Sequence, residues 1–181
     1  MSKVSNTASN KKVCLHSPIR MKHIVFLLLG TNLGDRKKNL TVARNAIELA
    51  VGPITNASAV YETAAWGKTN QAEFLNQAIA VETMFSPERV LEEILGIEHN
   101  MGRKRDIKWA ERIMDIDILL YENEIIDRPH LRVPHPELPN RRFALVPLTE
   151  IAGDVVHPIN KNTIRSLLAS CPDTLMVKVF P

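Results

Sequence analysis

Residues 113–121 limit the fold more than any other part of this sequence, because acidic and apolar side chains alternate along them. Successive side chains of a β-strand point to opposite faces, so Asp115 and Asp117 are predicted to share one face, with Cα atoms about 6–7 Å apart. The opposite face is predicted to enter a hydrophobic core through Met114, Ile116, Ile118 and Leu120. The pattern therefore predicts a sheet with a buried apolar face and a pair of carboxylates on the other face.

Apolar periodicity predicts the remaining elements. Further strands are expected at residues 23–29, 54–63, 75–82 and 175–179, and helices at 36–50, 86–101, 142–151 and 163–170. Ser86 and Pro87 are typical of a helix start, and Gly102 is typical of a left-handed helix stop. The order strand, helix, two strands, helix, strand predicts a ferredoxin-like α+β fold, with a mostly antiparallel sheet flanked by helices.

Length and composition predict one domain. A chain of 181 residues with 45% hydrophobic content can bury one core. Residues 1–20 are rich in Ser, Asn and Lys, so they are predicted to be a flexible leader before a single domain at 21–181. Cys14 and Cys171 show no zinc-ligand spacing, and no apolar stretch is long enough to span a membrane. A cytoplasmic protein is expected.

Five basic residues precede the carboxylate pair, at Arg103, Lys104, Arg105, Lys108 and Arg112. Two neighbouring carboxylates repel each other unless a cation lies between them, and Mg²⁺ needs only one or two protein carboxylates together with phosphate oxygens. The cluster therefore suggests a magnesium site beside a polyphosphate, which is what phosphoryl transfer requires. The alternative at this point is a solvated strand face whose aspartates pair with nearby arginines.

Residues 108–119 resemble the signature of the 6-hydroxymethyl-7,8-dihydropterin pyrophosphokinase family of folate biosynthesis. Further matches to this family occur in the same order at Gly30-Thr31-Asn32-Leu33-Gly34, Phe74-Leu75-Asn76, Val133-Pro134-His135-Pro136 and Arg141-Arg142-Phe143. The resemblance extends from about Met21 to the C-terminus. It implies that residues 21–181 are one pyrophosphokinase domain.

The resemblance implies a Mg²⁺-dependent transfer of the β,γ-diphosphate of ATP to the pterin hydroxymethyl oxygen, with release of AMP. Asp115 and Asp117 match the residues that hold two Mg²⁺ ions, and with Arg103 and Arg112 they are the expected catalytic residues. The expected ATP-binding residues are Glu98, Arg103, Arg105, Trp109, Arg112, Ile118, His135 and Arg141. The expected pterin-binding residues are Thr63, Ala64, Trp66, Phe74, Asn76, Asp115 and Phe143. The expected partners are ATP and the pterin, with no nucleic acid and no membrane, and the enzyme is expected to be a monomer.

Some positions depart from the family pattern. Ala64 and Ala65 follow the threonine where many members have proline, and Lys108 and His130 occupy positions where arginine occurs in other members. Lysine keeps the positive charge but loses the bidentate phosphate contact of arginine. Two other interpretations therefore stay open: a nucleic-acid-binding module with a basic loop beside its sheet, and a relative that binds pterin or ATP without turnover.

Two loops and one asparagine complete the predictions. Residues 65–71 and 103–112 are expected to close over the substrates and exclude water. Residues 30–34 lack the spacing of a phosphate-binding P-loop and of a dinucleotide-binding loop. Within them, Asn32 is expected either to form the floor of the pterin pocket or to have only a turn-and-cap role.

Overall fold

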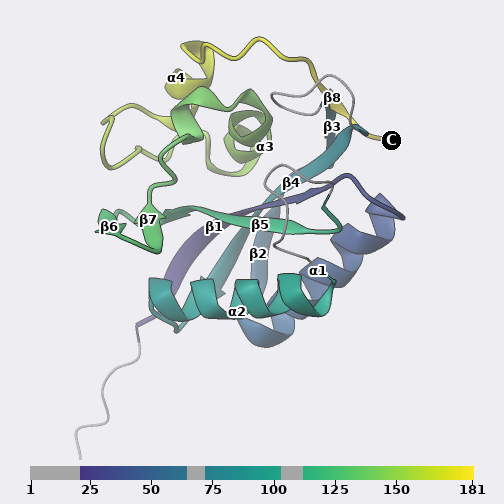
Figure 1. Ribbon diagram of the computed structural model, residues 1–181. Coiled ribbons are helices and arrows are strands. Elements are labelled where there is room, and N and C mark those ends of the chain that lie inside the picture. The colour runs from purple at the N-terminus through teal and green to yellow at the C-terminus, as the bar shows by residue number, and fades with distance from the viewer. Residues whose placement is uncertain (1–20, 65–71, 103–111) are drawn as a thin grey trace, which may run out of the picture.

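The fold is an antiparallel sheet between two pairs of helices (Figure 1). The computed structural model describes residues 21–64, 72–102 and 112–181. Along these residues the elements are β1 (His23–Thr31), α1 (Arg36–Ala50), β2 (Ile54–Ala57), β3 (Tyr61–Thr63), β4 (Phe74–Thr83), α2 (Pro87–Asn100), β5 (Asp115–Tyr121), β6 (Ile126–Arg128), β7 (Leu131–Val133), the 3₁₀ turn η1 (Leu138–Asn140), α3 (Arg142–Ala152), α4 (Ile164–Ala169) and β8 (Val177–Val179). The strand order is β5-β1-β4-β3-β8, β2 also pairs with β4, and β6 and β7 form a separate hairpin. The predicted α+β class is confirmed.

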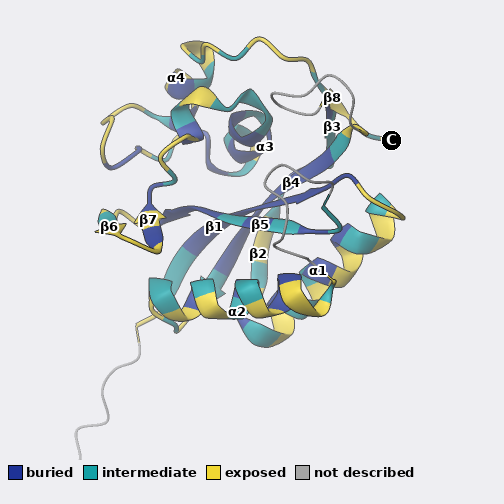
Figure 2. Cartoon of the chain, viewed as in Figure 1, coloured by how far each residue is buried: buried dark blue, intermediate teal, exposed yellow. Residues whose placement is uncertain are grey.

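The two faces of the sheet are covered by different helices. On one face, β1 and β4 pack against α1 and α2 through Val25, Leu27, Leu29, Ile79, Val81, Leu40, Ile47, Val90 and Ile94. On the other face, the alternate residues pack against α3 and α4 through Phe26, Leu28, Ala78, Ala80, Leu145, Leu148, Ile164 and Leu167. The central strands are therefore buried on both sides (Figure 2).

A β-bulge in β5 reverses the predicted direction of Leu120. Ile118 is paired with Leu27 and Leu120 with the preceding Phe26, so Leu119 is an extra residue in β5. Leu119 and Leu120 both enter the core beneath α3. Met114, Ile116 and Ile118 lie in the core beneath α1 and α2, as predicted. The prediction that Leu120 shares their face is wrong, because the extra residue changes the alternation beyond it.

The helix signals are confirmed at α2. The Ser86 hydroxyl accepts a hydrogen bond from the Arg89 backbone N–H, and Pro87 opens the helix. Gly102 has a φ of +93°, which is the left-handed conformation expected at a helix end. The predicted α2 therefore begins and ends close to the observed limits.

The strand predictions differ in three places. The predicted strand at 54–63 is divided into β2 and β3 at Ser58, whose hydroxyl accepts a hydrogen bond from the Ala78 N–H in place of a backbone carbonyl. The last strand begins at Val177 instead of residue 175. The β6–β7 hairpin lies in a region for which no strand was predicted. Three residues per strand are too few for a clear alternating pattern.

One row of residues crosses the sheet on the side of α3 and α4. Gly30 of β1 pairs with Asn76 of β4 on one side and with Asp115 of β5 on the other. Directly opposite residues of antiparallel strands point to the same face. The row therefore lies on the same face of the sheet as Leu28 and Ala78, at the polar end of that face.

Candidate active site

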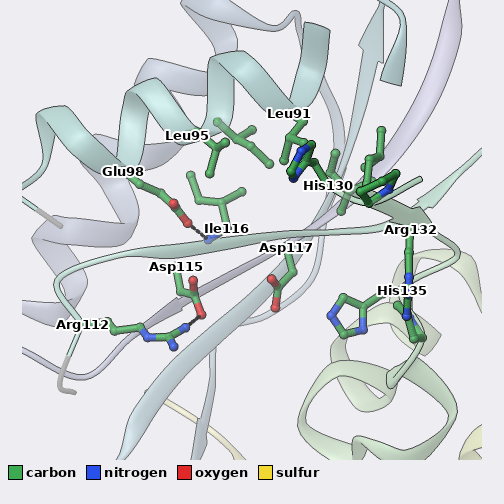
Figure 3. A pocket seen from close by; sticks show the side chains of 15 residues that line it. Leu91, Leu95, Glu98, Arg112, Asp115, Ile116, Asp117, His130, Arg132 and His135 are labelled. Carbon is green, nitrogen blue, oxygen red and sulfur yellow. Dashed lines mark hydrogen bonds and ion pairs between the residues drawn. The ribbon is translucent and has the colours of Figure 1, made fainter. Parts of the chain in front are cut away.

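Asp115 and Asp117 project from the same side of β5, as predicted (Figure 3). Arg112 forms an ion pair with Asp115, and Nη1 of Arg141 lies 3.9 Å from a carboxylate oxygen of Asp117. Ile116 is buried on the opposite side of the strand. Two carboxylates and two guanidinium groups therefore meet at the edge of the sheet.

The Asp117 carboxyl group holds its proton unusually strongly. Desolvation, followed by the negative charge of Asp115, raises the pKa of Asp117 from 3.8 to about 7, although Arg141 acts in the opposite direction. The side chain is still 33% exposed, so water reaches it and reduces the effect of burial. A cation bound between the carboxylates would remove their mutual repulsion. The pair is therefore suited to a divalent ion.

Glu98 reaches β5 from α2 and holds its backbone. The Glu98 side chain is buried, and its Oε1 accepts a hydrogen bond of 2.7 Å from the backbone N–H of Ile116 (Figure 3). Ile116 lies between Asp115 and Asp117 in the sequence. Glu98 therefore fixes the segment of strand from which both carboxylates project.

A cavity of about 380 Å³ runs along the open edge of β5. Its apolar wall comes from α2, and its opposite wall comes from the β6–β7 hairpin and the segment that follows it. The residues around it include Leu91, Ile94, Leu95, Glu98, Arg112, Asp115, Asp117, Ile118, His130, Arg132 and His135 (Figure 3). The cavity therefore combines an apolar wall with the charged groups of β5.

His135 enters this cavity as a neutral side chain. Desolvation, followed by the positive charge of Arg141, lowers the pKa of His135 from 6.5 to about 4. Its Nδ1 accepts a hydrogen bond of 3.1 Å from the Glu137 N–H. An imidazole that accepts through Nδ1 carries its proton on Nε2. His135 can therefore donate a neutral hydrogen bond to a ligand.

Three of the predicted pterin residues, Thr63, Phe74 and Asn76, lie beside the row that begins at Asp115. The Nδ2 of Asn76 donates a hydrogen bond of 2.8 Å to the Thr63 hydroxyl, and both side chains are buried. A Cβ at Gly30 would lie 3.2 Å from Oδ1 of Asn76 and 3.9 Å from Cδ1 of Phe74. Glycine at this position therefore leaves a flat surface bordered by an amide oxygen and an aromatic ring.

Residues 26–153 match the family described as 7,8-dihydro-6-hydroxymethylpterin-pyrophosphokinase (HPPK). The chain belongs to this family. The 2-amino-4-hydroxy-6-hydroxymethyldihydropteridine pyrophosphokinase of Aquifex aeolicus is 42% identical over 141 residues, which are 78% of this chain and 88% of that protein. The enzyme of the same name from Haemophilus influenzae is 38% identical over 157 residues, covering 86% of this chain and 98% of that protein.

Solved structures confirm the fold of this pyrophosphokinase. Plasmodium falciparum HPPK-DHPS with pteroate superposes with a TM-score of 0.70 at 19% identity, covering 83% of this chain and 44% of that chain. A second HPPK-DHPS structure, in complex with substrates, gives a TM-score of 0.68 at 18% identity over 83% of this chain and 43% of that chain. The chain thus spans less than half of these proteins. The predicted ferredoxin-like fold is confirmed.

Family membership confirms the predicted reaction, which is diphosphate transfer from ATP to the hydroxyl of hydroxymethyldihydropterin. The structure brings six predicted residues to one cavity: Glu98, Arg112, Asp115, Asp117, Ile118 and His135. Arg141 lies beside Asp117, with its guanidinium carbon 5.8 Å from the centre of the Phe143 ring. Ala64 is exposed. The predicted residues Trp66, Arg103, Arg105 and Trp109 lie outside the described residues.

Several residues of this site were not predicted from the sequence. Leu91 and Leu95 have the spacing of a buried helix face, but both line the cavity, and Leu91 also packs against the core. Arg132 lines it from the unpredicted hairpin. Asn32, expected as a pocket-floor residue or a turn-and-cap residue, accepts a hydrogen bond from the Arg112 N–H, which the sequence did not indicate.

The carboxylate pair has the donor set that Mg²⁺ accepts. Within the described parts of the chain, no group of three or more His, Cys, Asp or Glu side chains is arranged to hold a metal ion. Two carboxylates are sufficient for Mg²⁺ when phosphate oxygens and water complete its shell. Among the helices of the described residues, none has both the length and the apolar character needed to cross a membrane.

Proposed function

We propose that this enzyme binds ATP in the cavity along β5 and the pterin on the sheet surface around Gly30 and Asn76, with two Mg²⁺ ions held by Asp115 and Asp117. The position of Asp115 is the observation that supports this arrangement. Asp115 lines the cavity and also stands in register with Gly30, which pairs with Asn76. The phosphate end of the ATP site and the pterin site therefore meet at one carboxylate.

The nucleoside is assigned to the apolar part of the cavity. Leu91, Ile94 and Leu95 offer a surface for adenine. The Ile116 N–H points toward Glu98 and away from β1, and a strand repeats this direction every second residue. The backbone of Ile118 therefore faces the same open edge. We assign this backbone and the neutral His135 side chain as polar contacts of the nucleoside.

The pterin is assigned to the amide and aromatic groups beside Gly30. The hydrogen bond to Thr63 uses one N–H of Asn76 and fixes the amide, which leaves its oxygen over Gly30. An amide supplies both a donor and an acceptor to the ring edge. Phe74 and Phe143 are assigned as stacking partners, each worth about 1–3 kcal/mol by analogy with stacked nucleobases. Ala64 and Trp66 complete the wall by resemblance.

The chemical step needs positioned charge more than a strong base. The pterin hydroxyl oxygen forms a bond to the β-phosphorus and releases its proton to water, the bond from that phosphorus to the oxygen of the α-phosphate breaks, and AMP leaves. The Mg²⁺ ions, when bound, neutralise the phosphates and polarise the β-phosphoryl group. Asp115 is assigned to orient the hydroxyl. Arg112 and Arg141 are assigned to the phosphates, and Arg103, Arg105 and Trp109 join them by resemblance.

Residues 21–181 are proposed to be the whole catalytic unit, acting as a monomer. The described residues assigned here lie between positions 30 and 143, and the family match covers residues 26–153. Deleting residues 1–20 should therefore leave kcat and both KM values within about twofold. Size-exclusion chromatography with light scattering tests the monomer. A deletion that abolishes turnover of a folded protein would reject the assignment of the leader.

Product analysis tests the reaction. The protein is incubated with Mg²⁺, ATP and 6-hydroxymethyl-7,8-dihydropterin, and the nucleotide product is identified by chromatography. AMP formed only in the presence of pterin supports the proposal. ADP would indicate an ordinary kinase, and the absence of any nucleotide product would indicate a relative that only binds its ligands.

Two substitutions test the two subsites separately. Phe143→Ala should raise the KM for the pterin about tenfold or more, because it removes a stacking surface, while the KM for ATP changes little. His135→Ala should show the opposite pattern. Phe180→Ala is the matched control, since Phe180 packs beside Arg36 and Lys37 away from the site. Equal effects of Phe143→Ala on both KM values would contradict the subsite assignment.

A further inference from the structure

We propose that Asn32 is a positioning residue that holds the backbone of Arg112 so that its guanidinium group meets Asp115. This inference rests on the proposed role of Arg112 at the phosphates. The Asn32 side chain is only 3% exposed. Its Oδ1 accepts a hydrogen bond of 2.7 Å from the Arg112 N–H, and its own N–H donates one of 3.1 Å to the Arg112 carbonyl. Arg112 is thus held at both of its backbone polar groups by a single residue.

These bonds extend the pairing of β1 and β5 beyond its last regular pair. Gly30 pairs with Asp115, and Asn32 continues β1 beyond Gly30 to meet Arg112. The Arg112 side chain is 32% exposed, and its reach to Asp115 starts from the backbone that Asn32 holds. The position of its backbone therefore decides whether the guanidinium reaches Asp115, with which it forms the ion pair in Figure 3.

The partners of Asn32 exclude a simple turn or cap role. Its Nδ2 donates a hydrogen bond of 3.4 Å to the carbonyl of Ala72, so both side-chain bonds reach distant segments. The cap of α1 is supplied by Asp35, which accepts from the Lys38 N–H at 3.0 Å. The turn is held by Asn39, whose Nδ2 donates a hydrogen bond of 2.8 Å to the Leu33 carbonyl. Asn32 is therefore left to connect β1 with Arg112 and Ala72.

Two variants separate the two side-chain bonds. Asn32→Ala removes both of them and leaves the Arg112 N–H without its acceptor. Asn32→Asp keeps an oxygen for the Arg112 N–H and loses the N–H that bonds Ala72. If the bond to Arg112 is the important one, Asn32→Asp should keep kcat within about threefold, whereas Asn32→Ala should lower it roughly tenfold, as expected for one lost buried hydrogen bond.

A double-mutant cycle distinguishes positioning from general loss of structure. AMP formation is measured in the wild type, Asn32→Ala, Arg112→Ala and the double variant, with circular dichroism and Tm for each protein. If Asn32 acts through the Arg112 side chain, adding Asn32→Ala to Arg112→Ala should lower kcat by less than about threefold. Asn39→Ala, which loosens the same turn without contacting Arg112, is the matched control and should change kcat by less than about threefold.

Each result bears on a separate claim. If Asn32→Ala lowers kcat tenfold in the Arg112→Ala background as well, the positioning role is overturned and a structural role is indicated. A tenfold loss of kcat in Asn39→Ala would lead to the same conclusion. Wild-type kcat in Asn32→Ala would overturn it directly. If Asn32→Ala fails to fold, retention of kcat by Asn32→Asp supports the role and its loss overturns it. Wild-type kcat in Arg112→Ala would reject the function proposed for Arg112, and this inference with it.

Discussion

Two cavities of similar volume lie beside α2, β5 and the β6–β7 hairpin, at opposite ends of β5. The first, of about 380 Å³, is the proposed ATP site. The second, of about 410 Å³, lies between the start of α2, the end of β5 and the β6 strand. Both contain acidic side chains. Volume and acidity therefore do not distinguish the proposed active site from the other end of the same strand.

The cavities differ in how their charges are balanced. In the second cavity Glu88 forms an ion pair with Arg128, and His23, beside it, lies 3.1 Å from Glu122. In the first cavity two carboxylates share one strand face, and the pKa of Asp117 rises to about 7 through burial and the charge of Asp115. Repulsion that a cation would relieve supports the proposal that the first cavity is a ligand site. In the second cavity the Glu88–Arg128 ion pair brings opposite charges together.

The largest expected effect is the loss of Asp117. Asp117→Ala should lower kcat by roughly 10³-fold or more, because it removes a proposed Mg²⁺ ligand and positioned charge is the main source of rate in phosphoryl transfer. The fold should persist, since removing one carboxylate relieves repulsion. AMP formation and Tm are the measurements. The matched control is Glu124→Ala at the second cavity, where the side chain is exposed.

Wild-type turnover in Asp117→Ala would remove the distinction between the two cavities. A loss of similar size in Glu124→Ala would remove it as well. Loss of the far-ultraviolet circular dichroism signal in Asp117→Ala would mean that the carboxylate is needed for folding and would contradict the expected relief of repulsion.

The pH dependence of Mg²⁺ binding is expected to be the next largest effect. Protons and Mg²⁺ compete for Asp117, whose pKa is raised from 3.8 to about 7. With one competing proton, Mg²⁺ binding should weaken about tenfold between pH 8 and pH 6. The folded state keeps this proton to a higher pH than the unfolded state does. Without Mg²⁺, the contribution of Asp117 to the free energy of unfolding therefore falls as the pH rises from about 4 to 7.

Isothermal titration with Mg²⁺ and a non-hydrolysable ATP analogue measures this dependence. The Asp117→Asn variant is the control, because its amide cannot take up a proton and its weaker binding should vary less with pH. Equal Mg²⁺ affinity at pH 6 and pH 8 in the wild type would show that Asp117 does not hold the ion. The pH dependence of Mg²⁺ binding between pH 6 and pH 8 would then not distinguish the first cavity from the second.

A smaller effect is expected at the proposed pterin site, on the sheet surface beside the first cavity. Gly30→Ala places a methyl group 3.2 Å from Oδ1 of Asn76, so the amide that bonds Thr63 must move by a few tenths of an ångström. The KM for the pterin should rise about fivefold to tenfold with the KM for ATP nearly unchanged, as for a modest steric loss in a binding site. Gly96→Ala is the control, because its added methyl group meets nothing within 4 Å.

Gly96→Ala also has a predicted effect of its own. Gly96 lies inside α2, where alanine is favoured over glycine by about 0.5–1 kcal/mol. Tm should therefore rise slightly while both KM values stay constant. A higher KM for ATP in Gly30→Ala, equal to the change for the pterin, would contradict the separation of the two subsites at Asp115.

Local pattern was enough to predict the acidic face of β5, but not its continuation. The alternation of Asp115 and Asp117 is a property of neighbouring residues, so the sequence contains it. The direction of Leu120 depends on a bulge that arises from the register with β1. The partners of Asn32 are 40 and 80 residues away, and no local pattern indicates them. The hairpin that closes both cavities has strands too short to predict.

The smallest effect is expected at the second cavity and tests whether it has any function. Glu88→Gln removes the partner of Arg128 and a charge in the first turn of α2. Because both side chains are largely exposed, solvent screens the pair, and the free energy of unfolding should fall by less than about 1 kcal/mol. AMP formation should stay within about twofold of wild type, because the second cavity meets β5 only at Tyr121, beyond Asp117 along the strand. A tenfold loss of kcat at unchanged Tm would mean that the second cavity is coupled to the first through α2. It would also mean that an ion pair such as Glu88–Arg128 does not show that a cavity is without function.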